Sequence, residues 1–186
     1  MKISACCFTG YRPSKMPFPL AESSPEYIKL ENKLIDAVFS LPDEGCCTFY
    51  SGMAMGFDII AAETVLLLKN SLKDKPIKLI CALPFPEQTE KYTDEWKERY
   101  KRILEQADEV VTVSDRYLRG CYQKRNEYMV NNSDVVITWF DGQSGGTKNT
   151  ILYAQKKNKR IVNLNGVGIH EYFSENEYIV YCDDEE

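Results

Sequence analysis

Two glycine-containing segments carry residues whose types and spacing could bind an anion. The first is Ser144-Gly145-Gly146-Thr147, which lies between an apolar run and a helical pattern. Glycines lack a Cβ atom, so their backbone N–H groups can approach a phosphate, and the following helix presents the positive end of its dipole. Thr147 could donate its hydroxyl group to such a ligand or could be the helix N-cap. An ordinary glycine turn explains this motif, taken alone, equally well.

The second segment is Ser-Gly-Met-Ala-Met-Gly-Phe-Asp at residues 51–58, again between an apolar run and a helical pattern. Gly52 would permit a close backbone approach, and Asp58 would complement the helix dipole from the first turn. For an isolated aspartate, helix stabilisation is the simpler explanation. Two such junctions on one edge of a sheet make a phosphate or ribose site more credible than either junction alone.

Two arginines are candidate anion ligands, although an isolated arginine is usually solvated surface. Arg12 lies in a turn just after Gly10, and Arg125 lies on a helix from which it could reach the same edge. Aromatic side chains that could stack on a base are Tyr11, Phe85, Trp96 and Tyr117. The helical spacing of Trp96 with its aromatic neighbours favours core packing for that residue.

Metal chemistry and histidine-based catalysis find little support. His170 is the single histidine, so neither a histidine zinc site nor a Ser-His-Asp relay is expected. The seven cysteines form no C-x-x-C pair and mostly lie in apolar runs, which is typical of reduced core thiols. Any catalysis would have to come from carboxylates, arginines or ligand groups, and the sequence leaves open whether the chain is an enzyme. We expect no metal and no required cofactor.

These residues need a scaffold, and the chain alternates short apolar runs with helical patterns. The predicted strands are 3–8, 46–50, 77–82, 109–113, 135–139 and 160–164, with a further edge strand at 178–182. The predicted helices are 27–41, 57–69, 92–104, 121–131 and 147–157. The mostly continuous apolar runs favour strands buried on both faces of a parallel sheet. We therefore predict an α/β fold, a Rossmann-like doubly wound, mostly parallel sheet flanked by helices in three α/β/α layers.

Ligands of open α/β sheets bind beyond the carboxyl ends of the strands. Most glycine and small polar residues of this chain follow the predicted strands, whereas the opposite connections are plain charged loops. The candidate ligand-binding residues at this edge are Gly10, Arg12, Ser51, Gly52, Met53, Gly56, Asp58, Pro84, Ser114, Asp115, Tyr117, Arg125, Asn126, Asp141, Ser144, Gly145, Gly146, Thr147 and Thr150.

Length and charge narrow the class of protein. We predict one domain over residues 1–186 with a short acidic tail at 183–186. The chain has 28 acidic and 23 basic residues, and the tail alone holds four of the acids. The nearly neutral body speaks against nucleic acid as a partner but allows a local pocket for one small anion. No run reaches the length of a membrane span and no signal-peptide pattern opens the chain, so we expect a cytoplasmic location.

Several sequence blocks of this chain resemble those of a known family, the YpsA-like proteins of Firmicutes in the SLOG (SMF/DprA–LOG) superfamily. The matching blocks follow in order at 8–13, 51–58, 61–63, 81–85, 114–117, 125–130 and 144–150. The resemblance implies a Rossmann-like fold with a nucleotide-related ligand site, and a link to cell division or stress.

Two related groups of proteins suggest alternative functions. The Lonely Guy phosphoribohydrolases, which remove a base from a nucleoside monophosphate, carry an Arg-Lys pair and a glutamate after Gly-Thr. Here Arg125 matches the arginine, but Asn126 stands in place of the lysine and Thr150 in place of the glutamate. The DNA-processing protein DprA resembles the 51–58 block, with Ala62 where that protein has histidine.

We therefore expect a sensor or adaptor for a small nucleotide-type ligand such as ADP-ribose, an NAD-like molecule or a nucleoside phosphate. Backbone amides of the two glycine segments would hold phosphate, Arg12 or Arg125 would neutralise it, and Asp58 or Asp115 would hold ribose hydroxyls. One alternative is a hydrolase or transferase acting on a nucleotide N-glycosidic bond, with Asp115, Asp141 or Glu87 in place of the missing glutamate. A second is single-stranded nucleic-acid binding as in DprA. A homo-oligomer or a protein partner stays open.

Overall fold

The computed structural model describes residues 3–173. The predicted strand at 178–182 and the acidic tail at 183–186 lie outside the described residues. Within that range six strands form one all-parallel sheet in the order β4-β3-β2-β1-β5-β6. The strands are β1 (Ala5–Thr9), β2 (Thr48–Ser51), β3 (Lys78–Leu83), β4 (Glu109–Thr112), β5 (Val135–Thr138) and β6 (Arg160–Asn163).

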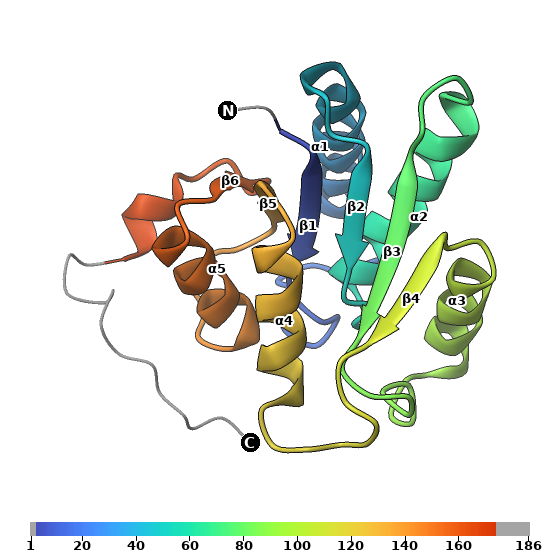
Figure 1. Ribbon diagram of the computed structural model, residues 1–186. Coiled ribbons are helices and arrows are strands. Elements are labelled where there is room, and N and C mark those ends of the chain that lie inside the picture. Colours follow the sequence, from blue (N-terminus) through green and yellow to red (C-terminus); the bar gives the residue numbers. More distant parts are fainter. Residues whose placement is uncertain (1–2, 174–186) are drawn as a thin grey trace.

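Helices cover both faces of this sheet and complete the predicted three-layer α/β/α fold (Figure 1). They are α1 (Pro25–Ser40), α2 (Phe57–Ser71), α3 (Asp94–Leu104), α4 (Cys121–Asn131) and α5 (Gly146–Lys156), with short 3-10 turns η1 (Leu41–Glu44) and η2 (Ile169–Tyr172). Helices α1, α2 and α3 pack on one face over the larger apolar cluster, and α4 and α5 pack on the other over a smaller one. None of the helices described is long and apolar enough to cross a membrane.

Local sequence explains where the elements begin and what they bury. Helix α1 begins after Ser24, whose hydroxyl accepts a hydrogen bond from the Tyr27 N–H at 3.3 Å, with Pro25 in the first turn. The predicted apolar stripe of α1 is buried against the sheet. Trp96 of α3 is also buried, which confirms core packing for that side chain.

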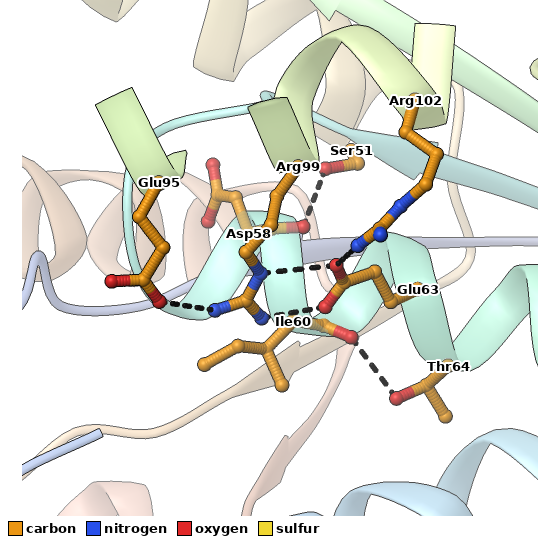
Figure 2. Close-up of polar contacts among 8 residues, drawn as sticks. All are labelled: Ser51, Asp58, Ile60, Glu63, Thr64, Glu95, Arg99 and Arg102. Atoms are coloured by element: carbon orange, nitrogen blue, oxygen red, sulfur yellow. Dashed lines mark hydrogen bonds and ion pairs between the residues drawn. The ribbon is translucent and has the colours of Figure 1, made fainter. Parts of the chain in front are cut away.

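Helices α2 and α3 are joined by a cluster of ion pairs (Figure 2). Glu63 of α2 accepts hydrogen bonds from Arg99 Nη2 at 2.6 Å and Arg99 Nε at 3.0 Å, and Arg102 lies 3.4 Å away. The Arg99 guanidinium also lies 4.2 Å from the ring centroid of Trp96. Glu63, one of the residues of the family resemblance, therefore stabilises the packing of two helices.

Two expectations about burial have different outcomes. The prediction that all six strands are buried on both faces is wrong for the two edge strands: β6 has no fully buried residue, and Val110 of β4 is exposed, because each edge strand has a neighbour on one side only. The expectation of reduced core thiols is confirmed for the six cysteines of the described range, which are all free and mostly buried. Burial raises the pKa of Cys7 and of Cys81 to about 12, which leaves these thiols unreactive.

The strand order places the predicted site. The chain adds β2, β3 and β4 outward from β1 and then returns to place β5 on the other side of β1. The strand order therefore reverses between β1 and β5, and the loops after the strands gather at the carboxyl edge of the sheet, the lower edge in Figure 1. Helices α2, α4 and α5 all begin at this edge.

Candidate functional site

Helices α4 and α5 begin side by side at the carboxyl edge, and each begins after a glycine. Their N-cap residues are Gly120 and Gly145, which have no side chain to cap the helix, and neither helix has an acidic residue in its first turn. A Cβ atom added at Gly120 or at Gly146 would meet no atom of another described segment within 4 Å, so no described part of the chain covers these two glycines. Two adjacent positive helix ends form an environment suited to an anion, with Gly146 exposed at the start of α5, while the first N–H group of α4, at Cys121, donates to the Leu118 carbonyl at 3.0 Å.

A hydrogen bond between the two helices fixes this arrangement. Asn126 Nδ2 of α4 donates to Thr150 Oγ1 of α5 at 2.9 Å, and that hydroxyl donates to the Gly146 carbonyl at 2.7 Å. Asn126 and Thr150 occupy the positions where the Lonely Guy motif has lysine and glutamate. The two residues that differ from that motif therefore form one uncharged, hydrogen-bonded pair.

The β2–α2 junction at 51–58 is closed. The Phe57 N–H of α2 donates to the Tyr11 carbonyl at 3.2 Å, and a Cβ atom at Gly56, whose φ is 100°, would collide with that carbonyl. Ser51 Oγ donates to the Asp58 carbonyl at 2.8 Å (Figure 2) and accepts from the Met53 N–H at 3.2 Å. The β1–α1 loop thus covers the N-terminus of α2.

Arg125 explains why residue 52 is a glycine. Its side chain is 4% exposed, and its Nη1 donates to the carbonyl of Gly52 and, at 3.4 Å, to that of Ala82. A Cβ atom at Gly52 would overlap the guanidinium. The close approach that Gly52 permits is therefore made by Arg125, and Nε of the same guanidinium donates to Asn126 Oδ1 at 2.8 Å.

Asp58 lies beside this arginine and is itself only 5% exposed. One of its carboxylate oxygens accepts a hydrogen bond from the Ala54 N–H at 3.4 Å. Burial raises the pKa of Asp58 to about 6, and the positive charges of Arg125 and Arg12 oppose that rise. Burial likewise lowers the pKa of Arg125, which the charge of Asp58 opposes. The two side chains form a buried charge pair under the glycine loop.

The β5–α5 loop is anchored to the β1–α1 loop. Tyr11, which is buried, donates from its hydroxyl to Asp141 Oδ1 at 2.7 Å and accepts from the Gln143 N–H at 3.1 Å. Burial and this carboxylate raise the pKa of Tyr11. Lys15 Nζ donates to the Ser144 carbonyl at 2.9 Å. These contacts hold the start of α5 in place, and they engage the Asp141 carboxylate in a hydrogen bond within the protein.

The other predicted site residues lie around this centre. Arg12 is exposed, and its guanidinium lies 5.6 Å from the centroid of the Tyr122 ring. Pro84 is buried at the end of β3, Ser114 is half-buried and Asp115 is exposed after β4. Thr147 is buried in the first turn of α5. Among the described residues there is no group of three or more side chains suited to a metal ion.

Three residues at this edge were not predicted from the sequence as site residues. They are Lys15, Tyr122 and Gln143, which contact Ser144, Arg12 and Tyr11 respectively. Tyr122 could have been predicted as a site residue, because it is the second residue of a helix that begins at a strand-end loop. Lys15 and Gln143 lie in loops, and no comparable sequence pattern indicates them as site residues.

Comparison with known proteins agrees with this fold. The model of the YpsA family, described as the YspA SLOG family, matches residues 6–170. The SPbeta prophage-derived protein YoqJ of Bacillus subtilis (strain 168) is 34% identical over 146 residues, which are 72% of this chain and 84% of that protein. A UPF0398 protein of Bacillus cereus is 29% identical over 178 residues, covering 93% of this chain and 90% of the relative.

Two solved structures share the architecture. DNA processing protein A of Helicobacter pylori, described for its single-stranded DNA binding mode, superimposes with a TM-score of 0.57 at 20% identity. The protein of the same name from Streptococcus pneumoniae gives 0.56 at 16% identity. Each match covers 86% of this chain, which spans 64% and 50% of those longer chains. At such identities the likeness shows the fold, and the family follows from the match over residues 6–170: the chain belongs to the YspA SLOG family.

Proposed function

We propose that this protein binds a small nucleotide-type ligand at the carboxyl edge of the sheet and acts as a sensor or adaptor. The ligand class comprises nucleoside phosphates, ADP-ribose and NAD-like molecules. The observation that carries the proposal is the pair of open, glycine-initiated helix N-termini, α4 and α5, held side by side by the Asn126–Thr150 hydrogen bond.

The surrounding residues support roles for the parts of such a ligand. Phosphate oxygens would accept hydrogen bonds from the first N–H groups of α5, at Gly146 and Thr147. The exposed guanidinium of Arg12 would neutralise the phosphate charge from the neighbouring loop. Asp115, exposed after β4, would accept hydrogen bonds from ribose hydroxyls. Arg125 and Asp58 would shape the floor of the site, because both are buried.

Binding is better supported than cleavage of an N-glycosidic bond. At position 150 the chain offers a hydroxyl that is already bonded to Gly146 and Asn126, so no carboxylate is available there to activate water. Asp141, one of the replacement carboxylates considered, is bonded to Tyr11. Release of free base from any nucleotide at enzyme-level concentrations would reverse this preference.

Isothermal titration calorimetry with ADP, ADP-ribose and NAD tests the proposal, with adenosine as the matched ligand that lacks phosphate. We expect at least one phosphate-bearing ligand to bind in a one-to-one ratio, while adenosine binds far more weakly. Absence of binding by all three phosphate-bearing ligands would refute the proposal. Equal affinity for adenosine would show that the helix N-termini do not contribute to ligand binding.

Single-stranded nucleic acid is a second candidate ligand, which a local feature favours. Residues 116–124 contain three basic residues and no acidic one, although the chain as a whole is acidic. Tyr117 within this segment is exposed, and an aromatic ring in a basic segment is what single-strand binding uses. The fold likeness to Helicobacter pylori DprA supports the same candidate and weighs against our expectation that nucleic acid is not a partner. Affinity for an oligonucleotide that falls steeply with salt would support it.

A further inference from the structure

An exposed aromatic ring lies at the carboxyl edge, in the connection from β4 to α4. Tyr117 is 62% exposed, and the next residue, Leu118, is exposed as well. The Tyr117 ring meets Phe85 edge to face, with centroids 5.4 Å apart and planes inclined at 83°. Such a contact occupies at most one face of the tyrosine ring. A large apolar face is therefore left in water, which costs free energy unless something covers it.

The ring is held in a small cluster, which we call the aromatic ledge: Arg12, Phe85, Tyr117 and Tyr122. Phe85 is 7% exposed and meets Tyr122 as well, at 5.7 Å and 80°. Arg12 lies 5.6 Å from the Tyr122 centroid. Four side chains from the loops after β1, β3 and β4 and from the first turn of α4 thus make one surface of rings and positive charge.

The ledge adjoins the N-terminus of α4. Tyr122 is the second residue of α4, and Tyr117 lies three residues before Gly120, the glycine at which α4 begins. A Cβ atom at Gly56 would lie 3.1 Å from Arg12 Cα, which places the Arg12 backbone at the start of α2, the helix that carries Asp58. A ligand with one anionic end and one flat aromatic end could therefore touch the helix N-termini and the ledge together.

We propose that the aromatic ledge is the base subsite, where an aromatic nucleobase stacks on the exposed Tyr117 ring while its phosphates face the starts of α4 and α5. This inference rests on the proposed function and narrows the ligand class to molecules that carry both a base and a phosphate. A sugar phosphate without a base would reach only half of the site. The base could belong to a free nucleotide or to a nucleotide within a single strand, and the experiment separates these sources.

The test is calorimetric titration of the full chain with ADP, ribose 5-phosphate and a short single-stranded oligothymidylate. Tyr117→Ala removes the ring, Tyr117→Phe keeps it, and Leu118→Ala is the neighbouring control. We expect Tyr117→Ala to weaken ADP binding by about 5- to 150-fold, the range found for loss of one base–aromatic stack. The Tyr117→Phe and Leu118→Ala variants should bind ADP like the parent protein. Ribose 5-phosphate should bind more weakly than ADP and equally to all variants.

Each remaining outcome decides between the two proposals. If Tyr117→Ala binds ADP as tightly as the parent protein, or if ribose 5-phosphate matches ADP, the ledge is refuted while the proposed function stands. If only the oligothymidylate binds and Tyr117→Ala weakens it, the ledge is a platform for single strands, and free ADP is not its ligand. If none of the three probes binds, the ledge is refuted, and the titrations with ADP-ribose and NAD decide the proposed function separately.

Discussion

Two glycine junctions that look alike in sequence differ in the structure. The junction at 51–58 is closed: Arg125 occupies the space beside Gly52, and the Tyr11 carbonyl takes the first N–H group of α2. The junction at 144–147 is open as far as residues 3–173 are concerned, since a Cβ atom at Gly146 would meet no other segment of that range within 4 Å. In the first junction the absence of Cβ atoms serves packing within the protein. In the second it leaves backbone N–H groups accessible, so we assign structural support to the first junction and ligand contact to the second.

The buried pair of Asp58 and Arg125 connects the two junctions. Arg125 holds the closed loop at the Gly52 carbonyl and, through Asn126, reaches Thr150 in the open one. A buried charge pair contributes little net stability, but removing one partner leaves the other uncompensated. Buried titratable groups with shifted pKa values occur more often at functional sites than elsewhere.

Arg125→Met should cause the largest loss of stability. The change leaves the Asp58 carboxyl group without its counter-charge and two buried carbonyls without their donor, so we expect the free energy of unfolding to fall by about 3–5 kcal/mol. Urea unfolding followed by circular dichroism measures this loss. Arg102→Met, at a largely exposed arginine, is the control and should cost less than about 1 kcal/mol. Similar losses for both variants would contradict a supporting role for Arg125.

Asp58→Asn should change the pH dependence of stability. The folded-state pKa of Asp58, about 6, is above its ordinary value of 3.8, so the folded protein binds this proton more tightly than the unfolded chain. As pH falls from about 6 to about 4, the parent protein should therefore gain roughly 2–3 kcal/mol relative to Asp58→Asn. Above about pH 7 the difference between the two proteins should be constant. A difference that does not vary between pH 4 and 6 would show that Asp58 titrates normally.

Gly56→Ala tests the closed junction at its backbone. At a φ of 100° and beneath the Tyr11 carbonyl, an alanine is strained, and we expect a loss of roughly 1–3 kcal/mol in the free energy of unfolding. Thermal unfolding of the variant provides the measurement. An unchanged midpoint would mean that the β1–α1 loop moves aside easily, and the closed junction would then resemble the open one.

Much of the fold could be predicted from the sequence. The runs of β-branched residues located all six strands of the described sheet to within two residues at each end, and α4 was predicted with the bounds observed. These patterns are local, because burial on both faces or along one stripe shows in neighbouring residues. The exposure of β4 was missed, since a run of apolar residues does not tell whether its strand lies at the centre or at the edge.

The site could be predicted in part. The sequence placed the glycines, Arg12, Asn126 and Thr150 at one edge because parallel strands end together. It could not tell that Gly52 faces Arg125 while Gly146 faces open space, since both follow a strand and precede a helix. Residue type and spacing do not encode which side chain lies opposite across the sheet, and that contact decides which glycine is free to meet a ligand.

Gly146→Ala should have the smallest effect on stability and the most direct effect on function. The added methyl group meets no described atom, so the free energy of unfolding should stay within about 1 kcal/mol of the parent value. The same methyl group would stand where a phosphate approaches the start of α5. Nucleotide affinity should therefore fall roughly tenfold or more, as for the loss of one hydrogen bond to a charged group.

One titration tests the central claim that the open junction binds the ligand. The parent protein, Gly146→Ala and the exposed-surface control Leu67→Ala are heated with increasing concentrations of ADP-ribose and of ADP. A ligand at a hundred times its dissociation constant stabilises the folded state by about 2.7 kcal/mol. We predict that the melting temperatures of the parent protein and of Leu67→Ala rise together, while that of Gly146→Ala rises only at higher ligand concentrations. Equal shifts for all three proteins, or no shift for any, would contradict the claim.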